Sequence, residues 1–189
     1  MKIGILGGSF DPPHTGQYFV LQQILELRKD INKILIIPAF RHQWKKFEAS
    51  TKDRLAMTKF LLQNKTEISE IEIKRRGISY AIDTIKEIKK ETGAQIFWIV
   101  GSDIIPEFHR WEKSEELASF AKFLVFPRDP YHLPTKLPKG FELITGKNLV
   151  TTNISSTIIR RRIKEGKSIE YLVPKEVEEY IRENNLYKT

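Results

Sequence analysis

The sequence has no cysteine among its 189 residues, which excludes disulfide bonds, thiolate nucleophiles and cysteine-ligated metals. It also lacks any apolar run close to the length of about 20 residues that a membrane-spanning helix needs. A signal peptide is not evident, because Met1 and Lys2 lead at once into a short apolar run and glycines. We therefore expect a cytoplasmic protein that has no membrane partner.

Acidic residues are the minority among the charged ones, since 24 Asp and Glu stand against 32 Lys and Arg and leave a net charge of +8. Such a charge could attract nucleic acid. The lysines are scattered, however, and the one tight cluster is Arg160–Arg162, whose consecutive helical positions point about 100° apart. We expect a diffuse positive field around a local phosphate site, and no nucleic-acid partner.

Internal repeats and low-complexity tracts are lacking too, and the contents of 40% hydrophobic and 30% charged residues are typical of globular proteins. The length suits one domain with a sizeable core, so we expect residues 1–189 to form a single domain.

Short apolar runs rich in β-branched residues alternate with segments of helical periodicity. This alternation predicts an α/β fold of the Rossmann-like, doubly wound type, with a mostly parallel sheet, helices on both faces and a C-terminal helical segment. The predicted strands lie near Lys2–Leu6, Lys33–Ile37, Ile68–Ile73, Gln95–Val100, Lys122–Phe126 and Phe141–Thr145. The predicted helices are Thr15–Arg28, Thr51–Gln63, Ala81–Glu91, Ser114–Phe120, Ser155–Glu165 and Pro174–Asn184.

Parallel sheets of this kind bind ligands beyond the carboxyl ends of their strands. The residues of chemical interest fall in segments that follow five of the predicted strands, namely 7–17, 38–46, 75–80, 101–111 and 127–128. We therefore expect a binding site along this edge of the sheet.

Residues 7–17 read Gly-Gly-Ser-Phe-Asp-Pro-Pro-His-Thr-Gly-Gln and follow the first predicted strand. The two glycines allow a sharp turn and a close approach to a bulky anion. A helix that begins at Thr15 would present unpaired N–H groups and the positive end of its dipole. His14 and Gln17 can face the mouth of that helix, and His14 can donate to phosphate and, when protonated, supply charge. The alternative is a plain glycine turn with a surface histidine.

Residues 154–160 read Ile-Ser-Ser-Thr-Ile-Ile-Arg near the other end of the chain. Ser155 or Ser156 makes a plausible helix N-cap, with Thr157 in the first turn. Ser156 and Arg160 are four residues apart and share a helix face, so hydroxyls, N–H groups and a guanidinium could converge on one anion. The alternative, an ordinary capped amphipathic helix, is compatible with this role.

Together the two motifs resemble the phosphate-handling signatures of nucleotidylyltransferases with a His-x-Gly-His motif. The order of features resembles the bacterial nicotinate-nucleotide adenylyltransferase family over nearly the whole chain. Residues 52–57, Lys-Asp-Arg-Leu-Ala-Met, are similar to the second helix of that family. Residues 76–84 resemble its Gly-x-Ser-Tyr-Thr-x-Asp-Thr segment, and Gly101-Ser102-Asp103 with Phe108 and Trp111 resembles its Gly-x-Asp…Trp segment.

The resemblance implies an enzyme of NAD biosynthesis that transfers AMP from ATP to nicotinate mononucleotide, giving deamido-NAD and pyrophosphate. Mg²⁺ is the expected cofactor, carried mainly by ATP, with no metal site on the protein. The residues implied to be catalytic are His14, Gln17 and Arg160. Those implied to bind ATP are Gly8, Ser9, Phe10, His14, Gly101, Asp103, Pro127, Arg128, Ser155, Ser156, Thr157 and Arg160. Those implied to bind the pyridine mononucleotide acceptor are Lys45, Ser79, Tyr80, Ala81 and Trp111.

Three positions depart from the family pattern. Gln17 replaces the second histidine of the first motif, and Ala81 replaces the threonine that in the family helps to hold the pyridine nucleotide. Where the family has Pro-Pro-His-Lys, residues 42–45 read His-Gln-Trp-Lys, so the lysine is retained without the prolines.

Several alternatives stay open. A related transferase could use nicotinamide mononucleotide as acceptor or CTP as nucleotide, whereas the pantetheine-phosphate enzyme of the superfamily fits less well. A non-catalytic nucleotide-binding regulator would account for the lost histidine. Trp111 could be a packing aromatic, Asp103 a helix cap and residues 42–46 the tip of a surface loop. The sequence also leaves a homo-oligomer open.

Overall fold

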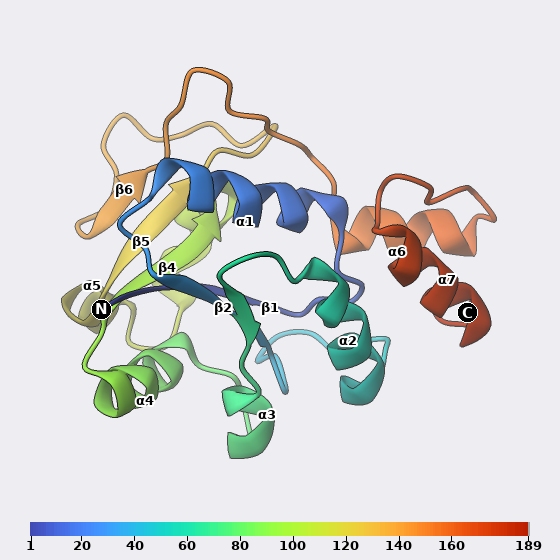
Figure 1. Ribbon diagram of the computed structural model, residues 1–189, viewed down its shortest axis with the longest axis horizontal. Coiled ribbons are helices and arrows are strands. Elements are labelled where there is room, and N and C mark those ends of the chain that lie inside the picture. The colour runs from blue at the N-terminus through green and yellow to red at the C-terminus, as the bar shows by residue number, and fades with distance from the viewer. Residues whose placement is uncertain (189) are drawn as a thin grey trace.

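A six-stranded parallel sheet forms the centre of the computed structural model, which describes residues 1–188 (Figure 1). Its strands run in the order β3-β2-β1-β4-β5-β6, which is typical of Rossmann-like sheets. The strands are β1 (Lys2–Gly8), β2 (Lys33–Pro38), β3 (Thr66–Ile68), β4 (Gln95–Gly101), β5 (Ala121–Phe126) and β6 (Phe141–Leu143). Every pair of neighbours is parallel, so the predicted Rossmann-like α/β fold is confirmed.

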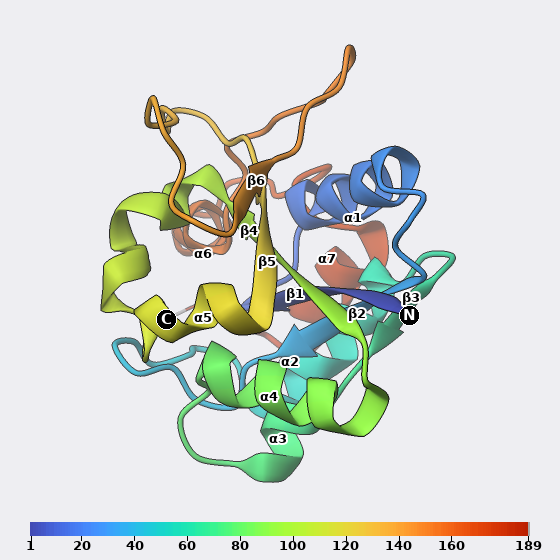
Figure 2. The same ribbon diagram turned by 90° about the vertical axis from the view of Figure 1, so that its left-hand side faces the viewer.

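Helices cover both faces of this sheet (Figure 2). On one face lies α1 (Thr15–Leu27), and on the other lie α4 (Ala81–Thr92) and α5 (Ser114–Phe120). The remaining helices are α2 (Thr51–Thr58), η1 (Lys59–Leu61), α3 (Ile71–Arg75), η2 (Ser102–Arg110), α6 (Ser156–Lys164) and α7 (Lys175–Glu183), of which η1 and η2 are 3₁₀ helices. None of the helices within residues 1–188 has the length and apolar character to span a membrane.

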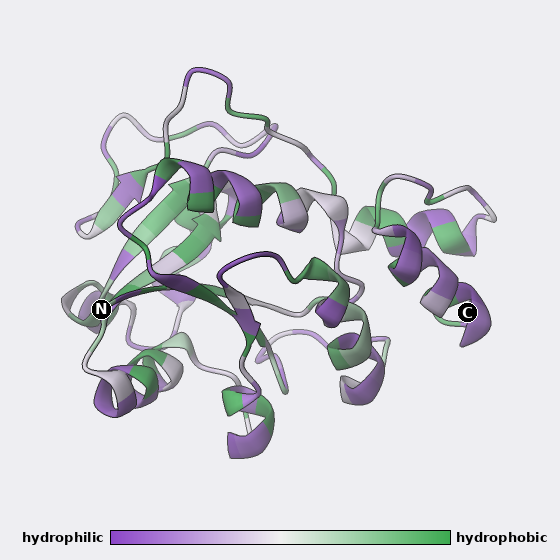
Figure 3. Ribbon diagram, viewed as in Figure 1, coloured by the Kyte–Doolittle hydropathy of each residue, from purple (hydrophilic) through white to green (hydrophobic). Residues whose placement is uncertain are grey.

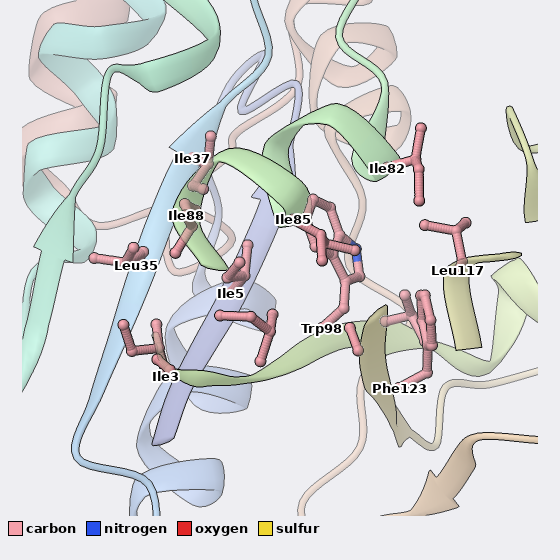
Figure 4. Packing of buried hydrophobic residues seen from close by; sticks show 14 of the residues in the cluster. Ile3, Ile5, Leu35, Ile37, Ile82, Ile85, Ile88, Trp98, Leu117 and Phe123 are labelled. Atoms are coloured by element: carbon pink, nitrogen blue, oxygen red, sulfur yellow. The ribbon is translucent and has the colours of Figure 1, made fainter. Parts of the chain in front are cut away.

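The two faces of the sheet carry separate apolar cores because side chains alternate along each strand. Ile5 of β1 belongs to the core beneath α4, where Figure 4 shows Ile85 and Ile88 beside it. Phe97 and Ile99 of β4 belong to the core beneath α1. Strands that are buried on both faces need nearly continuous apolar runs, which explains the hydrophobic colouring of β4 and β5 in Figure 3.

A third apolar cluster joins α2, α6 and α7, which lie beyond the carboxyl end of β1 (Figure 1). The backbone N–H of Thr15 donates to the carbonyl of Leu172 at 3.0 Å, so this cluster is tied to the start of α1. Its buried members are Ala49, Met57, Ile159, Ile169, Val173, Val177, Ile181 and Tyr187.

The predicted strand over 68–73 is wrong. In the structure β3 ends at Ile68, and residues 71–75 form the helix α3. The buried Glu72 accepts a hydrogen bond from Thr84 of α4 at 2.7 Å, and Arg75 donates to the same hydroxyl at 2.8 Å. These contacts with α4 outweigh the local β-propensity of the isoleucines, which is weak and depends on context.

The other differences concern the ends of elements. The predicted helix over 51–63 divides into α2 and η1, and the predicted strand over 141–145 ends at residue 143. Residues 102–110, which follow the fourth predicted strand, form the 3₁₀ helix η2.

Candidate active site

The strand order reverses direction between β1 and β4, and the position at the carboxyl ends of these two strands is called the crevice below. From β1 the sheet continues through β2 and β3, and from β4 it continues in the opposite direction through β5 and β6. The loops after β1 and β4 therefore diverge, and sheets of this type bind ligands at such a point. Residues 9–14 follow β1 and residues 102–111 follow β4, so the crevice lies between two segments that the sequence singles out.

Close packing and a buried arginine shape the turn after β1. A Cβ atom at Gly7 would lie 2.8 Å from the indole of Trp98, so a side chain at position 7 would collide with that ring. Phe10 is fully buried with a φ of 48°, a conformation that non-glycine residues rarely adopt. The buried Arg54 donates from Nη1 to the carbonyl of Ser9 at 2.7 Å and thereby helps to hold this turn.

His14 is the N-cap residue of α1 and is only 6% exposed. Burial, together with the positive charge of Arg128 nearby, lowers the pKa of His14 to about 3. The imidazole is therefore neutral at pH 7, and it does not supply the positive charge that a protonated histidine would. Its buried Nδ1 atom has no hydrogen-bond partner within residues 1–188, and a Cβ at Gly16 would lie 3.1 Å from that atom.

Gln17 supports the backbone of His14. Its Oε1 accepts a hydrogen bond from the His14 N–H at 3.1 Å. Its Nε2 lies 3.8 Å from the position that a Cβ at Gly8 would occupy, so the amide donor sits beside the glycine turn. The residue that departs from the family motif therefore links the turn to the first turn of α1.

The start of α6 packs directly against the turn after β1, so the two sequence motifs lie side by side. The hydroxyl of Ser156 donates to the carbonyl of Pro12 at 2.8 Å, and Nη1 of Arg160 donates to the carbonyl of Asp11 at 2.6 Å. Nε of Arg160 donates to Glu48 at 2.8 Å. The Ser156 hydroxyl and two of the five N–H donors of Arg160 are thus used within the protein.

Other donors at the start of α6 remain. Of the two predicted N-cap candidates, Ser155 is the N-cap, and its hydroxyl accepts a hydrogen bond from the N–H of Ile158 at 3.3 Å. Thr157 is exposed in the first turn. Early N–H groups of a helix have no partner within the helix, so this end offers donors and a positive dipole.

Across the crevice, Arg128 connects the ends of β4 and β5 to α6. Its Nη1 donates to Asp103 at 3.2 Å and its Nη2 to the carbonyl of Ile154 at 2.7 Å. A Cβ at Gly101 would lie 2.2 Å from Oδ1 of Asp103, so position 101 admits only glycine in this arrangement. In the described chain that Oδ1 atom is buried without a partner. With the half-buried Pro127, these residues gather beside the second motif.

Of the residues predicted to bind the acceptor, three lie together at the start of α4, and Trp111 lies in the aromatic packing around Trp98. Tyr80 is the N-cap of α4 and Ala81 its first residue, and the neighbouring Ser79 hydroxyl accepts an N–H from the loop after β2 at 2.9 Å. Trp111 packs edge-on against Trp98, with 6.3 Å between ring centroids, and its half-buried ring joins the core beneath α4. Trp111 therefore has the packing role that the sequence leaves open.

The loop after β2 brings Lys45 to the same edge of the sheet. Partial desolvation and the charge of Arg160 lower the pKa of Lys45, although its side chain is exposed. Burial and the charge of Lys45 lower the pKa of His42, which is thus a neutral group at pH 7. Arg110 of η2 stacks on Trp44 at 4.6 Å, so the loops after β2 and β4 touch.

Four further residues frame this site without a signal in the sequence. Asp11 and Arg54 lie within the motifs, but their burial, 2% and 1% exposed, cannot be seen in a single sequence. Glu48 and Tyr187 lie outside every motif. Asp11 lies in the turn after β1, and Arg54, Glu48 and Tyr187 contact this turn or Arg160 from distant parts of the chain.

Comparison with known proteins identifies related sequences. The sequence model of the family described as Cytidylyltransferase-like matches residues 5–162. A probable nicotinate-nucleotide adenylyltransferase of Halalkalibacterium halodurans is 37% identical over 194 residues, covering 100% of this chain and 92% of the relative. The nicotinate-nucleotide adenylyltransferase of Bacillus subtilis is 33% identical over 193 residues, covering 100% and 99%.

Solved structures share the architecture. Nicotinic acid mononucleotide adenylyltransferase of Plasmodium falciparum, complexed with NaAD, matches with a TM-score of 0.86 and 24% identity over 98% of this chain and 97% of that one. At this level of identity the likeness shows the fold.

Proposed function

The chain belongs to the cytidylyltransferase-like family, and we propose that it joins AMP from ATP to nicotinate mononucleotide in the crevice between β1 and β4. Its curated relatives are named as nicotinate-nucleotide adenylyltransferases. The products of the proposed reaction are deamido-NAD and pyrophosphate. The observation that carries the proposed site is the buried, neutral His14 at the mouth of α1, beside the start of α6.

The reaction needs alignment more than it needs a base. The acceptor phosphate is already anionic at pH 7, because the second pKa of a phosphate monoester is about 6. One of its oxygens forms a bond to the α-phosphorus of ATP, while the bond from that phosphorus to the bridging oxygen of the β-phosphate breaks. Pyrophosphate leaves with the electron pair. The protein therefore holds two anions in line and stabilises the charge that moves to the leaving group.

We assign the contact with the α-phosphate to His14. Its Nδ1 faces the first turn of α1, the end at which a helix presents backbone N–H donors, so the role of acceptor suits this nitrogen better than that of donor. The proton then lies on Nε2. Nε2–H is a neutral donor that needs no change of protonation during transfer.

The triphosphate is assigned to the positive groups on the other side of the turn. The N-terminus of α6, Arg160 and Lys45 supply donors and charge, while Ser156 holds the turn through Pro12. Gly8, Ser9 and Phe10 belong to the glycine turn, and we assign to their backbone a close approach to the nucleotide.

The adenosine moiety is assigned to the opposite wall of the crevice, formed by Gly101, Asp103, Pro127 and Arg128. The buried, unpartnered Oδ1 of Asp103 is an acceptor that suits a hydroxyl or amino group of the nucleoside. Nucleotidyltransferases generally use a divalent metal, and here we propose Mg²⁺ that arrives with ATP. Among residues 1–188 there is no group of three His, Cys, Asp or Glu side chains that could hold such an ion. Bound to the triphosphate, Mg²⁺ neutralises part of its charge.

The acceptor is assigned to the start of α4. Tyr80 and Ala81 place the N-terminus of that helix at the edge of the site, and its N–H groups favour a carboxylate over a carboxamide. Ser79 anchors this segment to the loop after β2, and Trp111 shapes it by packing against Trp98.

Pyrophosphate release from ATP tests this proposal, with nicotinate mononucleotide and nicotinamide mononucleotide as alternative acceptors. We expect faster release with nicotinate mononucleotide, because only its ring carries a carboxylate. The His14→Ala protein, prepared in the same way, serves as the control for contaminating activity. A preference for the amide would overturn the acceptor assignment, and no release with either acceptor would favour a non-catalytic nucleotide-binding protein.

A further inference from the structure

The carboxylate of Asp11 is buried beside the site and accepts three hydrogen bonds. Asp11 is 2% exposed and lies three residues before His14. Its Oδ2 accepts the N–H of Glu48 at 2.8 Å, and its Oδ1 accepts the N–H of Ala49 at 3.0 Å and the hydroxyl of Tyr187 at 2.8 Å. Its carbonyl accepts Nη1 of Arg160. Asp11 therefore ties the turn after β1 to three other parts of the chain.

Tyr187 is the most distant of these partners, 176 residues along the chain from Asp11. It follows α7 and is 6% exposed, within the cluster that also contains Met57 and Val177. Burial and the nearby carboxylate of Asp11 raise the pKa of Tyr187, so its hydroxyl stays protonated. The hydroxyl donates a hydrogen bond to the carboxylate. The ring packs in the helical cluster while the hydroxyl reaches the catalytic turn.

The segment between Asp11 and His14 is short and stiff. Residues 11–14 run from the carboxylate of Asp11 to the imidazole of His14, with Pro12 and Pro13 between them. Prolines restrict the backbone, so a shift at Asp11 is transmitted along this segment instead of being absorbed by it. Pro12 is held in addition by Ser156.

We propose that Tyr187 is a positioning residue: its hydroxyl holds the Asp11 carboxylate and thereby places the imidazole of His14 in the crevice. Docking of the segment after α7 is then coupled to the rate of AMP transfer. This inference rests on the proposed function, because it assigns Tyr187 an effect on the same site.

Tyr187→Phe tests the proposal, with Tyr180→Phe as a matched control. Tyr180 also donates its hydroxyl to a carboxylate, that of Asp53 at 3.0 Å, but this bond lies between α7 and α2 and does not reach the turn. Both variants keep the ring and lose one tyrosine–aspartate bond. We expect kcat of Tyr187→Phe to fall roughly tenfold with a KM for ATP within about twofold of the original, because small displacements of aligned groups cost rate. Tyr180→Phe is expected to keep its kcat.

A second readout separates positioning from general loosening. The ring of His14 can be followed by NMR during a pH titration. In the original protein it stays neutral down to about pH 3 because it is buried. In Tyr187→Phe we expect titration at a higher pH, as the ring becomes more exposed, while Tyr180→Phe retains the original curve.

The outcomes are distinguishable. If Tyr187→Phe is no slower than Tyr180→Phe and its His14 curve is unchanged, the positioning role is overturned. If the original protein transfers no AMP, the proposed function fails, and the NMR titration alone still decides whether Tyr187 places His14.

Discussion

At the scale of single residues, burial decides the charge of His14. A histidine in solution is partly protonated near pH 6.5. Here the protein around it and Arg128 keep the ring neutral far below that pH. The contact with phosphate is then a hydrogen bond from an uncharged donor to an anion. It favours transfer because the donor is already held where charge develops in the transition state.

Replacing His14 by alanine is expected to lower kcat roughly 100- to 1,000-fold, the loss typical of removing one donor that meets transition-state charge. The melting temperature is expected to change little, because the ring nitrogen Nδ1 has no partner within residues 1–188 to lose. Steady-state kinetics and thermal unfolding provide the comparison. Near-normal turnover with a normal melting temperature would reduce the first motif to a simple turn.

Gln17 is the second residue whose chemistry can be altered. A hydrogen bond between neutral groups contributes about 0.5–1.5 kcal/mol and one with a charged group about 1.5–3 kcal/mol. A protonated histidine at position 17 would add a charge that the Gln17 amide lacks. The difference of about 1–1.5 kcal/mol corresponds to roughly tenfold in rate. We therefore expect the natural protein to be slow but active, and Gln17→His to accelerate the chemical step in single-turnover experiments without much tighter ATP binding.

The same experiment on His42→Ala and Lys45→Ala asks whether the missing charge has moved to the neighbouring loop. His42 is neutral at pH 7, so its loss is expected to have little effect. Lys45 lies in the field of Arg160 and Asp11, and is the better source of charge. No gain from Gln17→His combined with a collapse in Lys45→Ala would show that Lys45 supplies it.

At the scale of elements, the start of α1 depends on a residue that has no side chain. A Cβ at Gly16 would lie 3.1 Å from Nδ1 and 3.3 Å from Cε1 of His14. Glycine is a poor helix former, less favourable than alanine by about 1 kcal/mol. The helix therefore gives up some stability where the His14 ring folds back against it.

Gly16→Ala is expected to lower kcat roughly tenfold by displacing the ring, because misplacement of aligned groups costs rate. Its stability is expected to stay the same or rise, since alanine favours the helix. The double variant with His14→Ala supplies the control. If Gly16→Ala slows the double variant as much as it slows the original protein, the effect does not pass through His14.

At the scale of the whole molecule, the neutral His14 links folding to pH. The pKa of His14 is about 3 in the fold and 6.5 in the unfolded chain, so below pH 6.5 the unfolded chain binds more protons. The contribution of the neutral His14 to the free energy of unfolding is therefore fully present above pH 6.5, and it is lost as the pH falls toward 3.

Between pH 7 and pH 5 this group alone is expected to remove about 2 kcal/mol of the free energy of unfolding. Urea unfolding at both pH values provides the measurement. Other groups titrate in the same range, so the quantity to compare is the pH dependence of the original protein against that of His14→Ala. Equal slopes in the two proteins would contradict the burial of a neutral imidazole.

Local patterns in the sequence were enough to predict a parallel sheet with helices on both faces, with the third strand misplaced. Runs such as Ile96–Val100 specify strands buried on both faces, and glycines followed by His14 specify a turn before a helix. Of the two N-cap candidates that the sequence offered, Ser155 and Ser156, the structure has Ser155. These features depend on neighbours within a few residues, which one sequence displays directly. The roles of the predicted site residues stay predictions.

The tertiary structure decided what depends on distant neighbours and on burial. The segment 71–75 became a helix because Glu72 and Arg75 contact Thr84. The neutral state of His14 follows from its exclusion from water. Two donors of Arg160 bond to Asp11 and Glu48, which lie 149 and 112 residues away along the chain. Burial and long-range contact arise only when the chain packs, because they join residues that the sequence keeps far apart.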